Sequence, residues 1–226
     1  MKKNKALRIG SCLAVVALLS TCLVAGTFAK YTTSGTSQDT ARVAKWGVTV
    51  QGAAGAFNSV YDAEDSATVK SENGTDKVVA PGTKATLAAN TLSGKPEVSV
   101  KVTNTGSFAL SDGWTLNDGS FYCPIKVTVP QSTGDDKVLS GLDYSSKDAF
   151  VAAVNGAIGG YEATYAANTN LSGAAKVSPE VSWEWTYDNG TGTAKTQTDE
   201  NDTYLTTKAD APTITLGVTT TVIQID

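Results

Sequence analysis

The side chains that could do chemistry in this chain are carboxylates, a cysteine and a few tryptophans, because the chain contains no histidine. Without an imidazole, the Ser-His-Asp and Cys-His arrangements have no group to take the proton of the nucleophile. The same absence excludes the His-Glu-x-x-His zinc site, whose ligands are two imidazoles. Hydrolysis by paired carboxylates stays open, although no pair stands out by its spacing. We therefore expect a protein that is not an enzyme and that needs no cofactor.

The acidic residues form three clusters, at positions 62–65, 135–136 and 199–202. None of them has the calcium-loop pattern of alternating oxygen ligands, a glycine and a closing glutamate. We interpret all three as solvated turns, with a weak calcium site at 199–202 as the alternative. No other metal site is expected.

Cysteine and tryptophan are the remaining candidates. Cys123 lies in the apolar run Phe121–Ile125, which favours a buried, unreactive thiol. Trp183 and Trp185 alternate with polar residues and are expected in the core, although exposed tryptophans could stack on sugar rings. The sequence leaves the exposure of Trp114 open.

The N-terminus has the parts of a secretory signal peptide. Four basic residues precede the apolar run Cys12–Ala25, which small residues follow. This run of 14 residues is shorter than the roughly 20 that a membrane-spanning helix needs. We expect cleavage between Ala29 and Lys30, secretion, and no stable membrane anchor afterwards. An uncleaved anchor helix and a lipoprotein acylated at Cys22 are the alternatives.

Removal of the signal peptide leaves 197 residues with 14 basic and 22 acidic side chains, a net charge of −8. Such a charge disfavours nucleic acid and anionic lipid surfaces as partners. The length fits one domain with a substantial core, and the single remaining cysteine cannot form an internal disulfide. We divide the chain into a signal peptide (1–29), a mobile N-terminal arm (30–42) and a β-sandwich domain (43–226).

Alternation of apolar and polar residues predicts a chain made mostly of strands. The predicted strands are 43–51, 97–104, 121–129, 181–187 and 213–222, with short strands and turns over 52–76 and a turn at Pro81-Gly82. One helix is expected, capped by Ser146, with Phe150, Val151, Val154 and Ile158 at helical spacing and Gly159-Gly160 at its end.

Several predicted strands have a threonine-rich face opposite an apolar face, so we expect them to be exposed on one side. Two sheets that pack their apolar faces together satisfy this pattern. The predicted fold class is therefore all-β, a jelly-roll-like β-sandwich with one helix in a crossover, preceded by a cleavable signal helix.

Several segments resemble a known family. Gly26–Thr32 resembles the signal-peptide end cut by the SipW-type signal peptidase, and Asp39–Val48 is similar to the start of many clostridial proteins of that class. Trp183–Trp185, Asp202–Leu205 and Thr220–Asp226 also look like this subgroup. The family is the TasA/camelysin family of secreted matrix proteins of Gram-positive bacteria.

The resemblance implies a secreted structural subunit of a biofilm-matrix or cell-surface fibre, with other copies and a SipW-type signal peptidase as partners. It also implies that the arm of one subunit completes a sheet of the next by β-strand addition. In the arm and at its end, Tyr31, Ala41 and Val43 are the candidate donor side chains. The alternative is a monomeric surface adhesin or glycan-binding module that uses an exposed Trp114 or Trp183.

Overall fold

The computed structural model describes residues 41–62, 68–174, 177–186 and 193–225, of which 193–197 are described by their backbone alone. The chain divides into two units, residues 1–43 and 44–226. The fold described below is that of the second unit.

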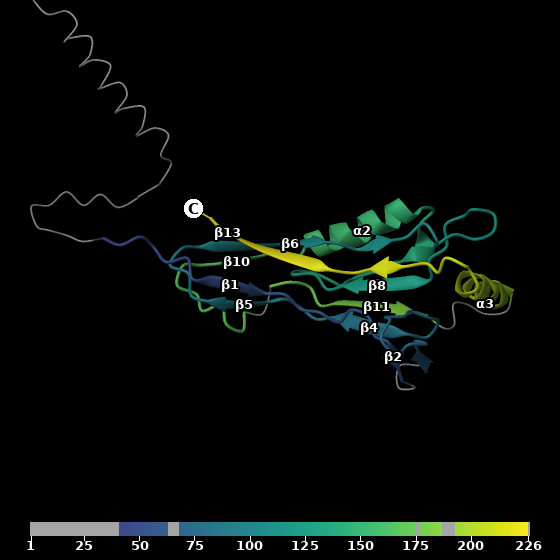
Figure 1. The fold of residues 1–226 in the computed structure, drawn as a ribbon. Helices are drawn as coiled ribbons and strands as arrows, with labels where there is room; N and C mark the ends of the chain where they lie inside the picture. The colour runs from purple at the N-terminus through teal and green to yellow at the C-terminus, as the bar shows by residue number, and fades with distance from the viewer. Residues whose placement is uncertain (1–40, 63–67, 175–176, 187–192, 226) are drawn as a thin grey trace, which may run out of the picture. The chain divides into compact units, whose positions relative to one another are not determined.

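The second unit is built from short strands whose pairs are all antiparallel (Figure 1). The strands are β1 (Val48–Gln51), β2 (Val60–Tyr61), β3 (Val69–Lys70), β4 (Lys84–Leu87), β5 (Thr91–Gly94), β6 (Val100–Gly106), β7 (Ala109–Leu110), β8 (Ile125–Val129), β9 (Lys137–Ser140), β10 (Ala163–Tyr165), β11 (Val181–Trp185), β12 (Ile214–Thr215) and β13 (Val218–Gln224). The helices are the 3-10 helix η2 (Gly141–Asp143) and the α-helices α2 (Lys147–Gly159) and α3 (Thr193–Thr206). The described chain is therefore a mostly-β protein of the antiparallel class.

Two sheets carry most of the structure. One has the strand order β4-β11-β8-β9 and the other β10-β6-β13. In β8 and β11 every second residue is buried, which follows the period of two in their sequences. Their inward side chains belong to the main core cluster with Phe108, Trp114 and residues of α2, whereas Leu92, Val100, Val102, Leu171 and Val177 form a smaller second cluster.

Helix α2 is where the sequence predicted a helix. The Ser146 hydroxyl accepts a hydrogen bond from the backbone N–H of Ala149 at 3.3 Å, as an N-cap does. Phe150, Val154 and Ile158 are buried on the side of the helix that packs against the sheets. The predicted turn is also confirmed, since Gly82 has a φ of +83° and the N–H of Thr83 donates to the carbonyl of Ala80.

The C-terminal strands form one continuous ladder with β6 and β7. Ile214 pairs with Leu110 in β12–β7, and Val218 pairs with Gly106 in β13–β6, so both pairs share one register. Between them the N–H of Ser107 donates to the carbonyl of Gly217 at 2.9 Å. The predicted strand 213–222 is therefore two strands that act as one, interrupted at 216–217.

Several predicted strand boundaries are wrong. The first strand begins at Val48 rather than Val43, because Gly47 has a φ of +54° and breaks the extended run. Trp46 precedes the strand and is 41% exposed. The strand predicted to end at Asn104 continues as β6 to Gly106. Asn104 is a buried strand residue whose side chain makes hydrogen bonds inside the protein, and it does not end the strand in a turn.

The strand predicted from Phe121 begins only at Ile125, after Pro124, which has no N–H to donate to a ladder. It ends before Pro130, as predicted. Strand β11 confirms the alternation from Val181 to Trp185, while Tyr187 lies outside the described residues.

The prediction of a single helix is wrong, because residues 193–206 form α3. This segment is polar, and its only buried apolar side chain among the described positions 198–206 is Leu205. A single apolar residue gives no helical periodicity, so the sequence contains no amphipathic pattern for this helix.

Candidate functional site

The candidate site begins with the outer edge of β13. Strand β13 pairs with β6 on one side, and no strand among the described residues pairs with its other side. The N–H of Ile225 donates to Ser99 and the carbonyl of Gly217 accepts from Ser107, so odd-numbered residues direct their backbone groups toward β6. The even-numbered residues therefore direct theirs away from β6. The carbonyl of Val218 accepts from Asn90 Nδ2, and the outward backbone groups of residues 220–224 form an open edge.

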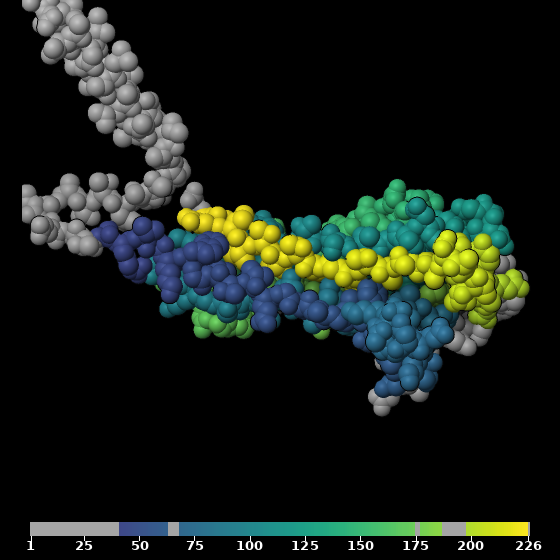
Figure 2. Space-filling view, in the orientation of Figure 1, coloured from purple at the N-terminus to yellow at the C-terminus, as the bar shows by residue number. Residues whose placement is uncertain are grey.

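A groove of about 410 Å³ lies beside these C-terminal strands. Residues 53–57, which follow β1, line one side, and residues 214–219 line the other. Figure 2 shows the yellow C-terminal strands running beside the purple-blue segment of β1 and the residues after it. We call this space the edge groove.

Asn90 bridges the two sides of the edge groove. Its Oδ1 accepts a hydrogen bond from the N–H of Ala53 at 2.9 Å, and its Nδ2 donates to the carbonyl of Val218 at 3.1 Å and to Thr220 Oγ1 at 2.8 Å. Asn90 is buried, and its own N–H donates to Ser178 Oγ. The Asn90 side chain therefore connects the segment after β1 to β13, although these two segments do not pair with each other directly.

The inner face of β13 is fixed by a second asparagine. Asn104 Nδ2 donates to the carbonyls of Tyr161 and Val177 at 2.7 and 2.9 Å. Its Oδ1 accepts from Thr220 Oγ1 at 2.7 Å. Because Asn104 is buried, this arrangement holds β13 in place and leaves its open edge preformed.

The chemistry of the edge groove suits an extended peptide. Its lining includes small and apolar residues, such as Ala54 on one side and Val218 on the other, together with the polar residues Lys77, Ser107, Thr215 and Thr219. An added strand gains affinity from main-chain hydrogen bonds and specificity from pockets that receive alternate side chains. The described residues that line the groove include no hydrogen-bonded pair of a nucleophile and a general base.

Two of the residues predicted for cleavage and strand donation are among the described residues. Ala29, Lys30 and Tyr31 lie outside the described residues. Ala41 and Val43 are described and exposed, Val43 to 92%. They belong to the unit 1–43, whereas the edge groove belongs to the unit 44–226.

The alternative function, a module that binds glycans through an exposed Trp114 or Trp183, does not fit the burial of these two side chains. Trp114 is 1% exposed and Trp183 is 2% exposed. The indole N–H of Trp114 donates to the carbonyl of Thr213 at 2.9 Å, and that of Trp183 donates to Ala56 at 2.6 Å. Both indoles are satisfied inside the core, which is the usual arrangement for a buried tryptophan, so the expected core position of Trp183 is confirmed.

The acidic cluster 199–202 is part of α3 and is not a solvated turn. Asp202 is buried, and its two carboxyl oxygens accept hydrogen bonds from the Tyr122 hydroxyl at 2.8 Å and from Trp185 Nε1 at 3.0 Å. Burial raises the pKa of Asp202, against the lowering effect of these two hydrogen bonds. Both oxygens are already bound by neutral donors, which is not the arrangement of a calcium loop.

The other acidic clusters agree with the prediction where the structure describes them, since Asp62, Asp135 and Asp136 are exposed. No group of three or more metal-type ligands occurs within the described ranges. Cys123 is buried, as predicted, and burial raises the pKa of its thiol to about 12, which favours the protonated form.

We compared the chain with protein-family models, with curated proteins and with solved structures, and none of the three comparisons returned a match. No helix in the described ranges is both long and apolar enough to cross a membrane. The functional argument therefore rests on the residues and on the geometry of the edge groove.

Proposed function

We propose that this protein is a secreted structural subunit of an extracellular biofilm-matrix or cell-surface fibre. Subunits join when the N-terminal arm of one copy, residues 30–42, adds as a strand to the edge groove of the next. The observation that supports this most directly is the open edge of β13 beside a preformed groove. The proposal includes the jelly-roll connectivity, export through a SipW-type signal peptidase, and the absence of enzymatic activity.

The length of the arm is compatible with this joining. At about 3.3 Å per residue, an extended arm of 13 residues reaches roughly 40 Å, enough to cover the whole of β13. The arm would satisfy backbone groups that β13 otherwise leaves to water. Ala41, Val43 and Tyr31 are the side chains that would enter the groove at alternate positions.

Electron microscopy of negatively stained protein tests the proposal. The exported form, Lys30–Asp226, is expected to form fibres, and the same protein without residues 30–42 is expected to stay monomeric. Ala54→Trp places a bulky ring at an exposed wall of the edge groove and should also prevent fibres. The matched control is Ala152→Trp on the exposed side of α2, which should assemble normally.

Persistent monomers of Lys30–Asp226, unchanged with pH and concentration, would contradict fibre formation. Normal fibres from the Ala54→Trp variant would contradict the edge groove as the acceptor. The two outcomes are distinguishable, because fibres still form if only the edge groove is wrong as the acceptor.

A further inference from the structure

A second cavity, of about 590 Å³, lies at the N-terminal end of α2 and is separate from the edge groove. Three segments line it: residues 111–115 after β7, residues 119–121, and residues 145–147 at the start of α2. We call it the α2 pocket. Its size lies within the range of about 300 to 1,000 Å³ that small-molecule sites occupy.

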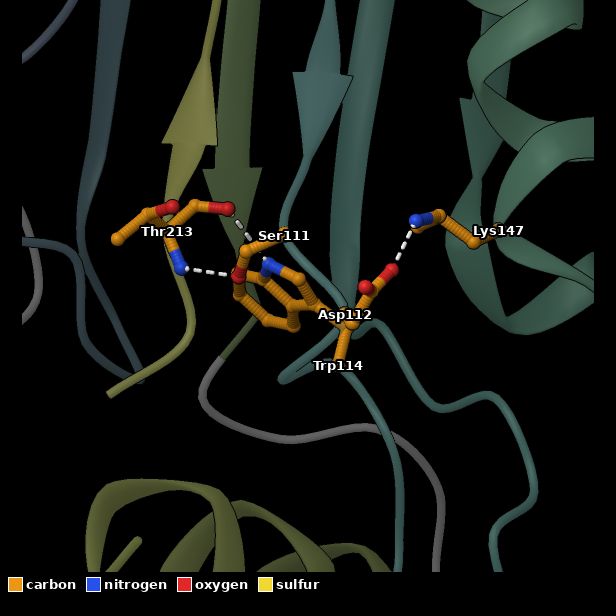
Figure 3. A network of polar contacts seen from close by, with 5 residues as sticks. All are labelled: Ser111, Asp112, Trp114, Lys147 and Thr213. Carbon is orange, nitrogen blue, oxygen red and sulfur yellow. Dashed lines mark hydrogen bonds and ion pairs between the residues drawn. The ribbon is translucent and has the colours of Figure 1, made fainter. Parts of the chain in front are cut away.

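The walls of the α2 pocket are fixed by hydrogen bonds. Trp114 Nε1 donates to the carbonyl of Thr213 at 2.9 Å, and the N–H of Thr213 donates to Ser111 Oγ at 2.8 Å (Figure 3). The loop that carries Phe121 is closed on itself, because Thr115 and Phe121 form a β-bridge and the N–H of Tyr122 donates to Trp114. The aromatic wall therefore needs no rearrangement to meet a ligand.

Phe121 provides the partly exposed aromatic ring of this wall. It is half-buried, unlike Trp114, which is almost fully enclosed. Serine or threonine residues of all three segments also line the pocket. An apolar ring in a cavity lined by hydroxyl-bearing residues matches a ligand that has both C–H faces and hydroxyl edges.

The only charged side chains that line the α2 pocket in the described chain are Asp112 and Lys147. They form an ion pair that joins the loop after β7 to the first residue of α2 (Figure 3). Asp112 is 96% exposed and Lys147 31%. Their charges cancel, so the pocket offers strong hydrogen-bond donors and acceptors without net attraction for an anion or a cation.

We propose that the α2 pocket binds one or two neutral hexose units of a polysaccharide. The C–H face of a sugar packs on the Phe121 ring, as apolar surface does on aromatic rings in water. Adjacent sugar hydroxyls donate to Asp112 and accept from Lys147. The volume admits such a ligand, and the balanced charges add no attraction for uronates or phosphates.

Nuclear magnetic resonance titration of the full chain tests this inference. The probes are cellotetraose, maltotetraose and chitotetraose as neutral oligosaccharides, and a polygalacturonate tetramer as the acidic one. We expect millimolar or tighter binding of at least one neutral probe, with amide shifts confined to residues 111–115, 119–121 and 145–147. Asp112→Asn, Lys147→Gln and Phe121→Leu should each weaken binding by about tenfold, equivalent to about 1.4 kcal/mol.

The matched control is Lys126→Gln. This variant removes the cation of the Lys126–Glu184 ion pair, which lies on the sheet β4-β11-β8-β9 and does not line the α2 pocket. This control should bind as the parent chain does. Absence of shifts with every neutral probe, shifts centred elsewhere, tighter binding of the acidic tetramer, or equal weakening by the control would each overturn the inference. Because Asp112 is exposed, its variant separates loss of binding from loss of folding.

Discussion

Asp202 provides the sharpest test of how α3 is attached. Its carboxylate accepts from the Tyr122 hydroxyl and from Trp185 Nε1. In Asp202→Asn the amide oxygen can accept from Trp185 while the NH₂ group donates to the Tyr122 oxygen, so both contacts survive without a charge. In Asp202→Ala the indole N–H of Trp185 loses its acceptor, and the Tyr122 hydroxyl keeps only a long contact of 3.5 Å with the carbonyl of Thr198.

The expected magnitudes follow from these two contacts. A buried polar group left unsatisfied costs about 1–3 kcal/mol, so Asp202→Ala should lower the free energy of unfolding by about 2–6 kcal/mol. For a domain of this size each kcal/mol shifts Tm by about 2–4 °C, so a fall of about 5–20 °C is expected. Asp202→Asn should be at least as stable as the parent protein at pH 7, because it no longer buries a charge.

The pH dependence has a definite sign. Burial raises the pKa of Asp202 above its ordinary value of 3.8, so folding favours the protonated carboxyl. This contribution to stability is fully present below pH 3.8 and is lost as pH rises through the folded pKa. Relative to Asp202→Asn, the parent protein should therefore gain stability as pH falls from neutral.

Urea unfolding followed by tryptophan fluorescence at several pH values measures these effects, because the Trp114 and Trp185 rings lie 5.7 Å apart beside Asp202. Asp135→Asn, at an exposed aspartate, is the matched control. The reasoning is refuted if Asp202→Asn is as unstable as Asp202→Ala at pH 7. It is also refuted if the stability difference between the parent and Asp202→Asn does not change with pH.

Three further predictions concern single side chains. Cys123 should not react with a disulfide reagent at pH 8 until urea unfolds the protein, and rapid labelling of the folded protein would contradict its burial and its raised pKa of about 12. Ser146→Ala removes the N-cap bond to Ala149 and should cost about 0.5–2 kcal/mol in urea unfolding, so an unchanged midpoint would contradict the capping role. Asn104→Ala leaves two buried carbonyls without a donor and the Thr220 hydroxyl without its acceptor, and it should lower Tm in calorimetry by more than Thr220→Val does; the reverse order would contradict this network.

The sequence correctly predicted those elements whose spacing of apolar residues matches the side that the fold buries. Strand β11 and helix α2 have one apolar side each, and the structure buries those sides. Helix α3 could not be predicted, because its attachment depends on Asp202, an acidic residue in a polar segment. The partners of Asp202 are distant from it in the sequence, so no local pattern around Asp202 indicates that it is buried.

The edge groove was also beyond prediction from the sequence. Its walls come from residues 53–57 and 214–219, which are far apart in the chain, and Asn90 bridges them. The sequence indicated a strand near the C-terminus but not which of its edges stays open. Which edge stays open depends on the order of the strands in the sheet, and the periodicity of the sequence does not reveal that order.

The measurement that most directly tests the central claim is the binding of a synthetic arm peptide, residues 30–43 with a fluorescent label, to the unit 44–226. Fluorescence anisotropy should show saturable binding that Ala54→Trp abolishes and Ala152→Trp leaves unchanged. Absence of binding, or equal binding to the Ala54→Trp variant, would contradict strand addition at the edge groove.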